Sequence, residues 1–234
     1  MISLKAEVTE IFSSIQGEGI FLGARQIFVR FKRCNLACVF CDEAKNARAK
    51  EYTALELMSE IKFLELSKGP HHSVSFTGGE PLLYADFLKA FLPGLKKKRF
   101  TAYLETNGTL PDELAKVIDA VDIIAMDFKL PSSTGEKAFW DSHREFLKIA
   151  SKKKVFVKAI VTPKTTAVDV QKAISIIKES RKSIPLILQP ATPVRAGDRD
   201  IDKNRLLKFL EIGSKNHLEN IRVIPQVHKM LDVK

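Results

Sequence analysis

All three cysteines of this 234-residue chain, Cys34, Cys38 and Cys41, lie within eight positions in the spacing CxxxCxxC. Cysteine thiolates are the usual protein ligands of a 4Fe-4S cluster, and three of them can ligate three of its four irons. The fourth iron is then left for a small molecule, as an open coordination position is in catalytic metal sites. The spacing therefore predicts a catalytic cluster.

Two other interpretations of the cysteines stay open at this point. They could form a zinc site that lacks its fourth ligand, or they could be small buried hydrophobic residues. Neither His71 nor His72 stands at the spacing of a zinc finger. An odd number of cysteines suits a disulfide framework poorly, and reduced thiols indicate the cytoplasm.

A glycine-rich motif follows the short apolar run of residues 73–76. It reads Thr77-Gly78-Gly79-Glu80-Pro81. Glycines allow backbone to approach a ligand closely, and the Glu80 carboxylate could accept hydrogen bonds from an ammonium group. An ordinary turn at a strand end is the alternative explanation.

Short apolar runs alternate with longer amphipathic stretches, a pattern typical of parallel β/α units. We therefore predict an α/β fold, a partial, open β/α barrel of about six parallel strands with an N-terminal strand or loop extension. The strand candidates are residues 26–31, 73–76, 102–104, 123–125, 155–160, 185–188 and 221–224.

The helix candidates include residues 53–67, 168–180 and 203–212. In the first of these, Leu57, Ile61 and Leu64 form one apolar face, and Thr53 and Glu56 form a capping box. The segment 9–20 precedes the first barrel strand and is predicted to be a lid or a substrate-facing loop. We expect a single domain over residues 1–234, with residues 1–25 as a substrate-facing extension, and no membrane span.

The chain carries a net charge of +10, which raises the question of nucleic-acid binding. Its basic residues fall in short groups, 96–99 and 152–154, where helices are expected to end and where cations favour the helix dipole. No aromatic residues interleave with them as in a single-strand binding platform. A nucleic-acid partner is therefore not expected, and the charge suits a small anionic substrate equally well.

Polar residues follow successive predicted strands, and in parallel β/α barrels the loops at the carboxyl ends of the strands carry function. Each residue alone could be part of a common turn or a solvated lysine. Their recurrence at six strand ends predicts one shared site. The motifs are Cys34 to Cys41, Gly78-Gly79-Glu80, Glu105-Thr106-Asn107-Gly108, Asp127-Phe128-Lys129, Lys158 and Gln189-Pro190.

The cysteine spacing, with Phe40 before the last cysteine, and the glycine motif resemble the radical S-adenosylmethionine (SAM) superfamily. The resemblance implies a 4Fe-4S cluster on Cys34, Cys38 and Cys41 whose fourth iron binds SAM, and cleavage of SAM to a 5′-deoxyadenosyl radical. It also implies SAM contacts from Phe40, Cys41, Asp42, Gly78, Gly79, Glu80, Glu105, Asn107, Asp127, Phe128, Lys129, Lys158, Gln189, Pro190, Ala191 and Thr192.

The N-terminal segment, with its Gln16-Gly17-Glu18-Gly19 loop, resembles the 7-carboxy-7-deazaguanine synthases. Arg30, the runs TGGEPLL at 77–83 and ETNGT at 105–109, and Gln226-Val227-His228-Lys229 extend the likeness over nearly the whole chain. The resemblance implies conversion of 6-carboxy-5,6,7,8-tetrahydropterin to 7-carboxy-7-deazaguanine with loss of ammonia, a magnesium-dependent lyase reaction toward the deazapurines of tRNA such as queuosine.

The residue types suit a carboxylated pterin. Arg30 offers a planar fork for a carboxylate, and Gln16 and Glu18 offer donors and acceptors for an amide-like ring edge. Arg30 could instead form an ion pair at the barrel rim, and Glu18 could be a turn residue. The resemblance implies substrate contacts from Ile15, Gln16, Gly17, Glu18, Arg30, Thr77, His228 and Lys234, the last through its terminal carboxylate.

Three positions depart from the family pattern. Glu43 stands where a threonine commonly ligates magnesium, and its carboxylate is a suitable Mg²⁺ ligand, although it could instead cap the next segment or pair with Lys45. Asp127-Phe128-Lys129 replaces a Ser-Pro-Lys motif and resembles the DxK of radical activating enzymes, which are the alternative function. Gln189-Pro190-Ala191-Thr192 lacks the acidic residue that often follows Gln-Pro. The family resemblance further implies a flavodoxin-type or ferredoxin-type electron donor and a homodimer.

Overall fold

A computed structural model of the chain describes residues 4–43, 47–193 and 200–233. Within these residues nine strands form one sheet, in the order β3-β1-β2-β4-β5-β6-β7-β8-β9. The strands are β1 (Lys5–Ile15), β2 (Arg25–Phe31), β3 (Lys50–Thr53), β4 (Ser73–Gly78), β5 (Ala102–Thr106), β6 (Ile123–Asp127), β7 (Lys154–Val161), β8 (Leu186–Pro190) and β9 (Ile221–Val223).

Strands β2 and β4 to β9 pair in parallel, whereas β1 pairs antiparallel with both β2 and β3. The strand order has two ends, β3 and β9, so the barrel is open, as predicted. The described sheet has seven parallel strands, one for each of the seven strand candidates, although a barrel of about six was expected. The short strand β9, predicted at residues 221–224, extends the sheet beyond β8.

The prediction of a lid or loop over residues 9–20 was wrong for most of its length. Residues 5–15 form β1, which pairs with β2 from Val8 to Ile15. Most of its residues are half-buried, so its apolar alternation is weak in the sequence. Only the following segment leaves the sheet, and it contains the 3₁₀ turn Gly19–Phe21.

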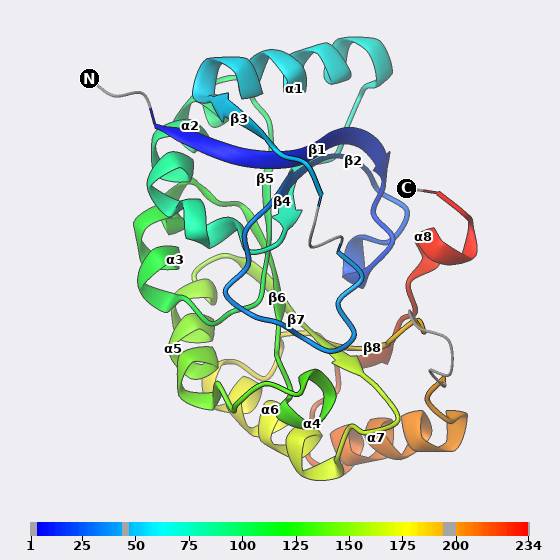
Figure 1. The fold of residues 1–234 in the computed structure, drawn as a ribbon. Coiled ribbons are helices and arrows are strands. Elements are labelled where there is room, and N and C mark those ends of the chain that lie inside the picture. The colour runs from blue at the N-terminus through cyan, green and yellow to red at the C-terminus, as the bar shows by residue number, and fades with distance from the viewer. Residues whose placement is uncertain (1–3, 44–46, 194–199, 234) are drawn as a thin grey trace.

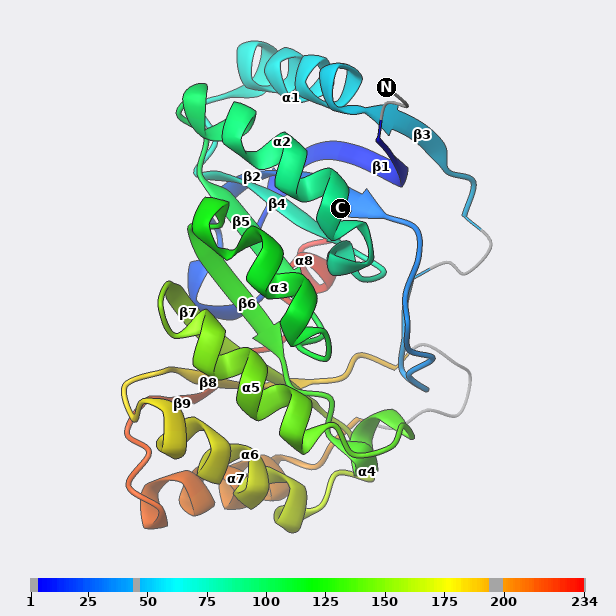
Figure 2. The ribbon, with the colours of Figure 1, turned by 90° about the vertical axis from the view of Figure 1, so that its left-hand side faces the viewer.

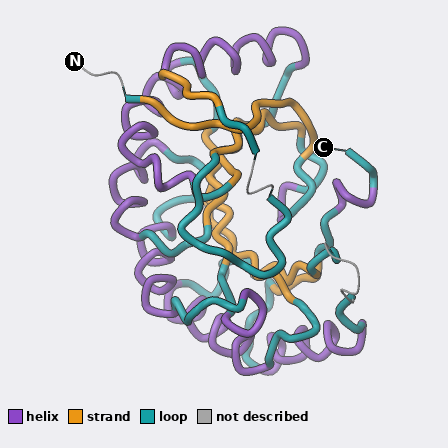
Figure 3. The backbone as a smooth tube through the Cα atoms, in the orientation of Figure 1, coloured by secondary structure: helices purple, strands orange, loops and turns teal. Residues whose placement is uncertain are grey.

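The helices cover the outer face of the sheet, and the inner face is left to the loops (Figures 1, 2 and 3). This is the expected result of joining parallel strands by right-handed helical crossovers. The helices are α1 (Ala54–Lys68), α2 (Ala85–Lys97), α3 (Pro111–Val117), α4 (Pro131–Thr134), α5 (Trp140–Ala150), α6 (Ala167–Ser180), α7 (Lys203–Lys215) and α8 (Val227–Met230), with 3₁₀ turns at Pro81–Tyr84 and Ile118–Ala120.

Helix α1 confirms the prediction made for its sequence. Thr53 is its N-cap and forms a capping box with Glu56, and Leu57, Ile61 and Leu64 are its buried residues. Helices α6 and α7 also lie where they were predicted, with ends shifted by at most three residues. No helix in the described ranges is long and apolar enough to cross a membrane.

Alternation along the strands divides the sheet into two faces with different roles. Outward residues such as Val74, Phe76 and Val157 join the large core beneath the helices. Inward residues near the amino ends of the strands form a second, smaller apolar cluster, which includes Tyr103 and Phe156. This cluster fills the barrel interior near the amino ends of the strands and leaves the cavity described below to their carboxyl ends.

Candidate functional site

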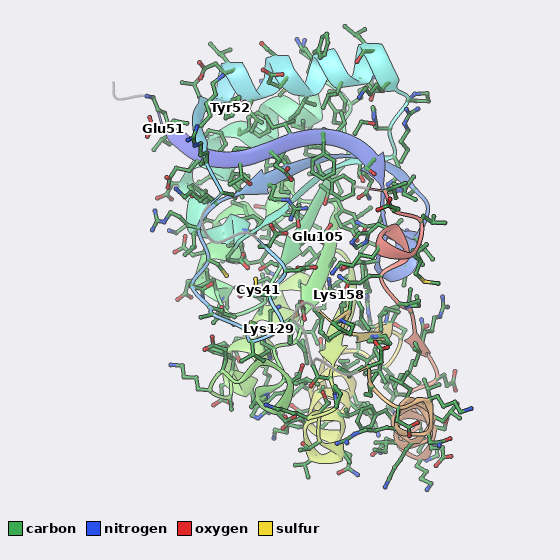
Figure 4. All side chains as sticks on the ribbon, turned by 45° about the vertical axis from the view of Figure 1, so that its right-hand side comes forward. Cys41, Glu51, Tyr52, Glu105, Lys129 and Lys158 are labelled. Carbon is green, nitrogen blue, oxygen red and sulfur yellow. The ribbon has the colours of Figure 1, made fainter. Side chains whose placement is uncertain are left out.

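A cavity of about 310 Å³ lies at the open, carboxyl end of the barrel interior. Its walls are the inward residues that follow the apolar cluster along each strand, such as Glu105 on β5, Asp127 on β6 and Lys158 on β7. Figure 4 shows Cys41, Glu105, Lys129 and Lys158 grouped at this end, far from Glu51 on the edge strand β3. The strands therefore extend beyond their apolar runs, and their polar last residues form the site.

The three cysteines all line this cavity and lie on the loop that follows β2. Hydrogen bonds from two backbone N–H groups hold this loop. Val39 N donates to Thr134 O in α4 at 3.0 Å, and Ala37 N donates to the Glu136 carboxylate at 2.6 Å. On the other side, Asn35 donates to Thr109 Oγ1 at 2.9 Å. The cysteine loop is thus tied to the loops after β5 and β6.

The environment of the free thiols favours their neutral, protonated form. Burial raises the pKa of Cys34 and raises that of Cys38 to about 11, while the positive charge of Lys129 opposes both shifts. Such thiols are protonated at neutral pH unless a cation sits at the sulfur. A coordinating metal deprotonates a thiol outright, so iron would reverse this preference.

The glycine motif forms a platform directly beside the cysteine loop. Gly79 N donates to Phe31 O at 2.8 Å, and Glu80 N donates to Arg33 O at 2.6 Å. A Cβ at Gly79 would lie 2.1 Å from Arg33 O, and Gly78 has a φ of +107°, which L side chains rarely adopt. Only glycine allows this close approach of the two backbones.

Changing Gly79 to alanine should force the cysteine loop away from the glycine motif. Overpacking of this kind typically costs about 1 to 3 kcal/mol, measured as the free energy of unfolding. The matched control is Gly94→Ala in α2, where a Cβ meets only Met58 at 4.0 Å and should stabilise by roughly 0.5 to 1 kcal/mol. Equal melting temperatures for the two variants would contradict the proposed packing.

Glu80 lies behind the cavity and is not among its lining residues. Its carboxylate accepts from Leu82 N at 3.0 Å, Thr106 Oγ1 at 2.8 Å and Asn107 N at 2.7 Å. Burial raises the pKa of Glu80 to about 7, although these three bonds favour the charged form. In this structure the side chain supports the end of β5, and the backbone of Gly78 and Gly79 is what faces the cavity.

The Asp127-Phe128-Lys129 motif directs its two charged side chains to the cavity. Lys129 Nζ donates to Asp127 Oδ2 at 2.8 Å and lies 5.8 Å from the ring centroid of Phe40. Burial alone would lower the pKa of Lys129, but Asp127 raises it, so the ammonium stays charged. Phe128 points away from the cavity and stacks on the buried ring of His143 at 4.6 Å.

Two buried polar groups of the described residues have no hydrogen-bond partner on this side of the site. One is Asp127 Oδ1, and the other is the whole side-chain amide of Gln189, which is fully buried. A carboxylate oxygen can only accept, whereas an amide can both donate and accept. Buried groups of this kind are normally satisfied, so they favour a polar ligand or water at this position.

Gln16 differs from its predicted role as a direct donor and acceptor for the substrate. Its Nε2 donates to Gln26 Oε1 and Glu105 Oε1, both at 3.0 Å, and its Oε1 accepts from Glu18 N at 3.0 Å. The side chain, only 3% exposed, anchors the Gln16–Gly19 loop to β2 and β5. It lines the cavity, and its amide positions the loop.

Glu18 faces the cavity and forms a half-buried ion pair with Lys158. Lys158 was predicted to close the fifth barrel strand, but it lies in the interior of β7, which continues to Val161. Burial raises the pKa of Glu18, but the charge and hydrogen bond of Lys158 outweigh it and lower the pKa to about 2. The Glu18 carboxylate is therefore ionised at all physiological pH values.

Arg30 forms ion pairs, which the sequence allowed as its alternative role, and its position also leaves it facing the cavity. It lines the cavity from β2, and it also pairs with Glu10, at 3.2 Å, and with Glu43. Glu43 thus lies at the mouth, with its carboxylate against the guanidinium. Lys45, its alternative predicted partner, lies outside the described residues.

The structure brings most of the predicted residues together. Lys234 lies outside the described residues, and Glu80, Phe128, Gln189 and Pro190 are not among the cavity walls. The predicted residues that do line the cavity are Ile15, Gln16, Gly17, Glu18, Arg30, Cys34, Cys38, Phe40, Cys41, Asp42, Glu43, Thr77, Gly78, Gly79, Glu105, Asn107, Asp127, Lys129, Lys158, Ala191, Thr192 and His228.

Further lining residues were not predicted from the sequence. Most are apolar or belong to strands, among them Phe12, Phe28 and Ile160, and nothing in their local sequence separates them from core residues. Gln226 and Lys229 were part of a recognised motif without an assigned role. Lys229 pairs with Asp42, beside the last cysteine.

Comparison with known proteins agrees with this arrangement. The family model of the radical SAM superfamily matches residues 28–185. A 7-carboxy-7-deazaguanine synthase of Geobacter sulfurreducens is 39% identical over 246 aligned residues, which cover 97% of each chain, and one of Methanothermobacter thermautotrophicus is 32% identical over all of both chains. The crystal structure of QueE from Escherichia coli shares the fold, with a TM-score of 0.63 at 17% identity over 95% of this chain and 94% of that chain.

The open barrel, the cysteine loop at its carboxyl end and the family match define a radical SAM enzyme. Within that superfamily the chain belongs to the 7-carboxy-7-deazaguanine synthases, since its likeness to them extends over its whole length.

Proposed function

We propose that the cavity binds 6-carboxy-5,6,7,8-tetrahydropterin and SAM together and that the enzyme releases 7-carboxy-7-deazaguanine and ammonia. The observation that carries this proposal is that one cavity is lined by the three cysteines, the glycine platform and the Gln16–Gly19 loop. Loss of ammonia accounts for the whole difference between substrate and product, so no external oxidant is needed. The next product of the route would be a deazapurine such as the precursor of queuosine.

Cys34, Cys38 and Cys41 are the residues that would hold the 4Fe-4S cluster. With SAM bound, the cluster would supply the electron for radical chemistry on the substrate. The residues of this chain bind, orient and shield the reactants. Lys129 and Phe40 form a wall next to the cysteines, and Gly78 and Gly79 also line the cavity.

The unpaired buried groups fit SAM at the β6 and β8 side of the cavity. Asp127 Oδ1 can accept from a ribose hydroxyl or from the methionyl ammonium group, and an amide such as that of Gln189 complements an adenine edge. Gln189 is fully buried behind Ala191 and Thr192, which do line the cavity. Water can occupy the same positions when no ligand is bound.

The substrate fits the opposite side, between β2 and the Gln16–Gly19 loop. Arg30 supplies a guanidinium for the carboxylate, and the ionised Glu18 supplies acceptors for the N–H groups of the pyrimidine ring. Thr77 and His228 also face this space. Residues 1–25, including β1, would form the substrate-facing part of one domain that spans the chain.

Magnesium is assigned to Glu43 on chemical grounds. Its carboxylate is at the cavity mouth and pairs with Arg30, so a metal would have to share or replace that pairing. A hard anionic oxygen suits Mg²⁺, which usually keeps several waters and takes one or two carboxylates.

Changing Glu43 to alanine should raise the Mg²⁺ concentration needed for product formation, and Glu43→Thr should partly restore it. The measurement is a Mg²⁺ titration of the product formed by each variant. Glu51→Ala on the distant strand β3 is the control, because it removes an exposed carboxylate that pairs with Lys5. Superimposable titrations for the parent and Glu43→Ala proteins would mean that the metal is bound elsewhere.

The remaining assignments follow from the family resemblance. A flavodoxin-type or ferredoxin-type donor would reduce the cluster, and the need for reduced thiols supports a cytoplasmic location. We also expect a homodimer.

The function is tested by anaerobic reconstitution with iron and sulfide, followed by incubation with SAM, reductant, Mg²⁺ and the carboxytetrahydropterin. We expect 7-carboxy-7-deazaguanine and ammonia in equal amounts. SAM cleavage without that product would favour a different substrate, such as the protein partner of an activating enzyme.

A further inference from the structure

The C-terminal segment that ends the chain packs directly against the Gln16–Gly19 loop. Val227 N donates to Gly17 O at 3.0 Å, and Gln226 Nε2 donates to Glu18 Oε1 at 2.8 Å. A Cβ at Gly17 would overlap the side chain of His228, so the two segments are in close contact. Gln226 is 8% exposed, although it lines the cavity.

The two oxygens of Glu18 are held by different residues. Lys158 donates to Oε2 and Gln226 donates to Oε1. Each carboxylate oxygen can accept more than one hydrogen bond, so both keep accepting capacity for a ligand. The carboxylate is fixed in direction while it stays able to accept two parallel N–H bonds.

The orientation of the Gln226 amide follows from its partners. A carboxylate without a proton can only accept, so the nitrogen of the amide must face Glu18 and the oxygen must face away. That oxygen accepts from the hydroxyl of Thr192 at 2.7 Å, which therefore donates. A continuous chain of hydrogen bonds runs from Thr192 after β8, through Gln226, to Glu18.

We propose that Gln226 is a positioning residue, which holds the ionised Glu18 in the direction required for the substrate and connects it to Thr192 on the SAM side of the cavity. The inference rests on the proposed function, since it assigns Glu18 to the substrate. Gln226 itself acts through Glu18 and does not take part in bond making or breaking. Lys158 has a matching role, as the counterion that keeps Glu18 charged.

The charged and titratable groups around Glu18 come from four further elements. Lys158 on β7 and His228 on α8 stabilise its charge. Asp42 on the cysteine loop and Tyr103 on β5 also lie within its electrostatic range. Lys158 is the strongest of these influences, because it both pairs with Glu18 and donates a hydrogen bond to it.

Two substitutions test the role of Gln226. Gln226→Met keeps the length of the side chain but removes the amide. We expect KM for the carboxytetrahydropterin to rise at least about tenfold, as is typical when a hydrogen bond to a charged group is lost. Gln226→Glu places a second carboxylate beside Glu18, so that KM should rise further at about pH 8. As the pH falls toward about 6, the pair should bind one proton, which restores a donor to Glu18, and KM should approach the parent value.

The pH signature separates positioning from a merely structural role, because a packing defect would not be repaired by one proton. Gln171→Met and Gln171→Glu on the exposed face of α6 are the matched controls. Iron content and melting temperature are measured for each protein. A parent-like KM in Gln226→Met, or a KM of Gln226→Glu that keeps a constant ratio to the parent from pH 6 to 8, would overturn the proposal.

The parent protein separates this inference from the proposed function. If the parent forms no 7-carboxy-7-deazaguanine, the function itself has failed, whatever the variants do. If the parent is active and the Gln226 variants behave as the parent does, the function stands and Gln226 has no positioning role.

Discussion

Replacement of Cys38 by alanine should remove the iron-sulfur cluster and with it all cleavage of SAM. The chain has no other cysteine beyond Cys34 and Cys41, so no thiol can substitute for the lost ligand. We expect the iron and sulfide content after reconstitution to fall to a small fraction of the parent value, together with the visible absorption of the cluster. Cys34→Ala and Cys41→Ala should behave in the same way.

Val39→Ala is the matched control for the cysteine variants. Val39 lies between the second and third cysteines, its side chain is 49% exposed, and its backbone bond to Thr134 does not depend on the side chain. It should keep parent-like iron content. Parent-like iron content and SAM cleavage in Cys38→Ala would refute the assignment of the cluster to this loop.

Much of the fold could be predicted because the relevant signals are local. The apolar runs gave the parallel strands, and the spacing of Leu57, Ile61 and Leu64 gave the buried face of α1. The sequence left open whether the N-terminal extension is a strand or a loop, and the reason is physical. Strand β1 lies near the edge of the sheet and is mostly half-buried, so selection for apolar residues on alternate positions is weak there.

The ends of the strands show a second limit of hydrophobic patterns. Thr77, Glu105 and Asp127 are strand residues, yet the apolar runs end before them. The sheet can continue through polar residues because its backbone ladder does not depend on the side chains, and the cavity provides polar surroundings for them. The apolar pattern therefore fails to predict the last strand residues, which are the ones that form the site.

Long-range partners were the least predictable part of the site. The sequence placed Gln16 and Glu18 in one loop, but it could not show that Gln16 is used internally by Gln26 and Glu105. Gln226 is 208 positions away from Glu18. Contacts between residues so far apart in the sequence depend on how the whole chain folds, and no local spacing encodes them.

Replacement of Arg30 by alanine should cause the largest loss of substrate affinity of any change outside the cluster loop. In the structure Arg30 is the cation between Glu10 and Glu43 at the cavity mouth, with its side chain 23% exposed. Its removal takes away the partner of the substrate carboxylate and leaves two carboxylates that repel it. Truncation of one member of such a pair typically costs about 2 to 5 kcal/mol.

Arg30→Lys and Arg25→Ala sharpen the Arg30 experiment. Lysine keeps the charge but loses the planar fork, so its substrate dissociation constant should lie between those of the parent and alanine variants. Arg25 is exposed at the opposite end of the same strand, and its replacement should leave the dissociation constant unchanged. If Arg30 served only as an ion pair at the rim, Arg30→Ala would lower the melting temperature while substrate affinity stayed at the parent value. Anaerobic measurement of substrate binding to the reconstituted proteins distinguishes the two roles, because it reports affinity separately from stability.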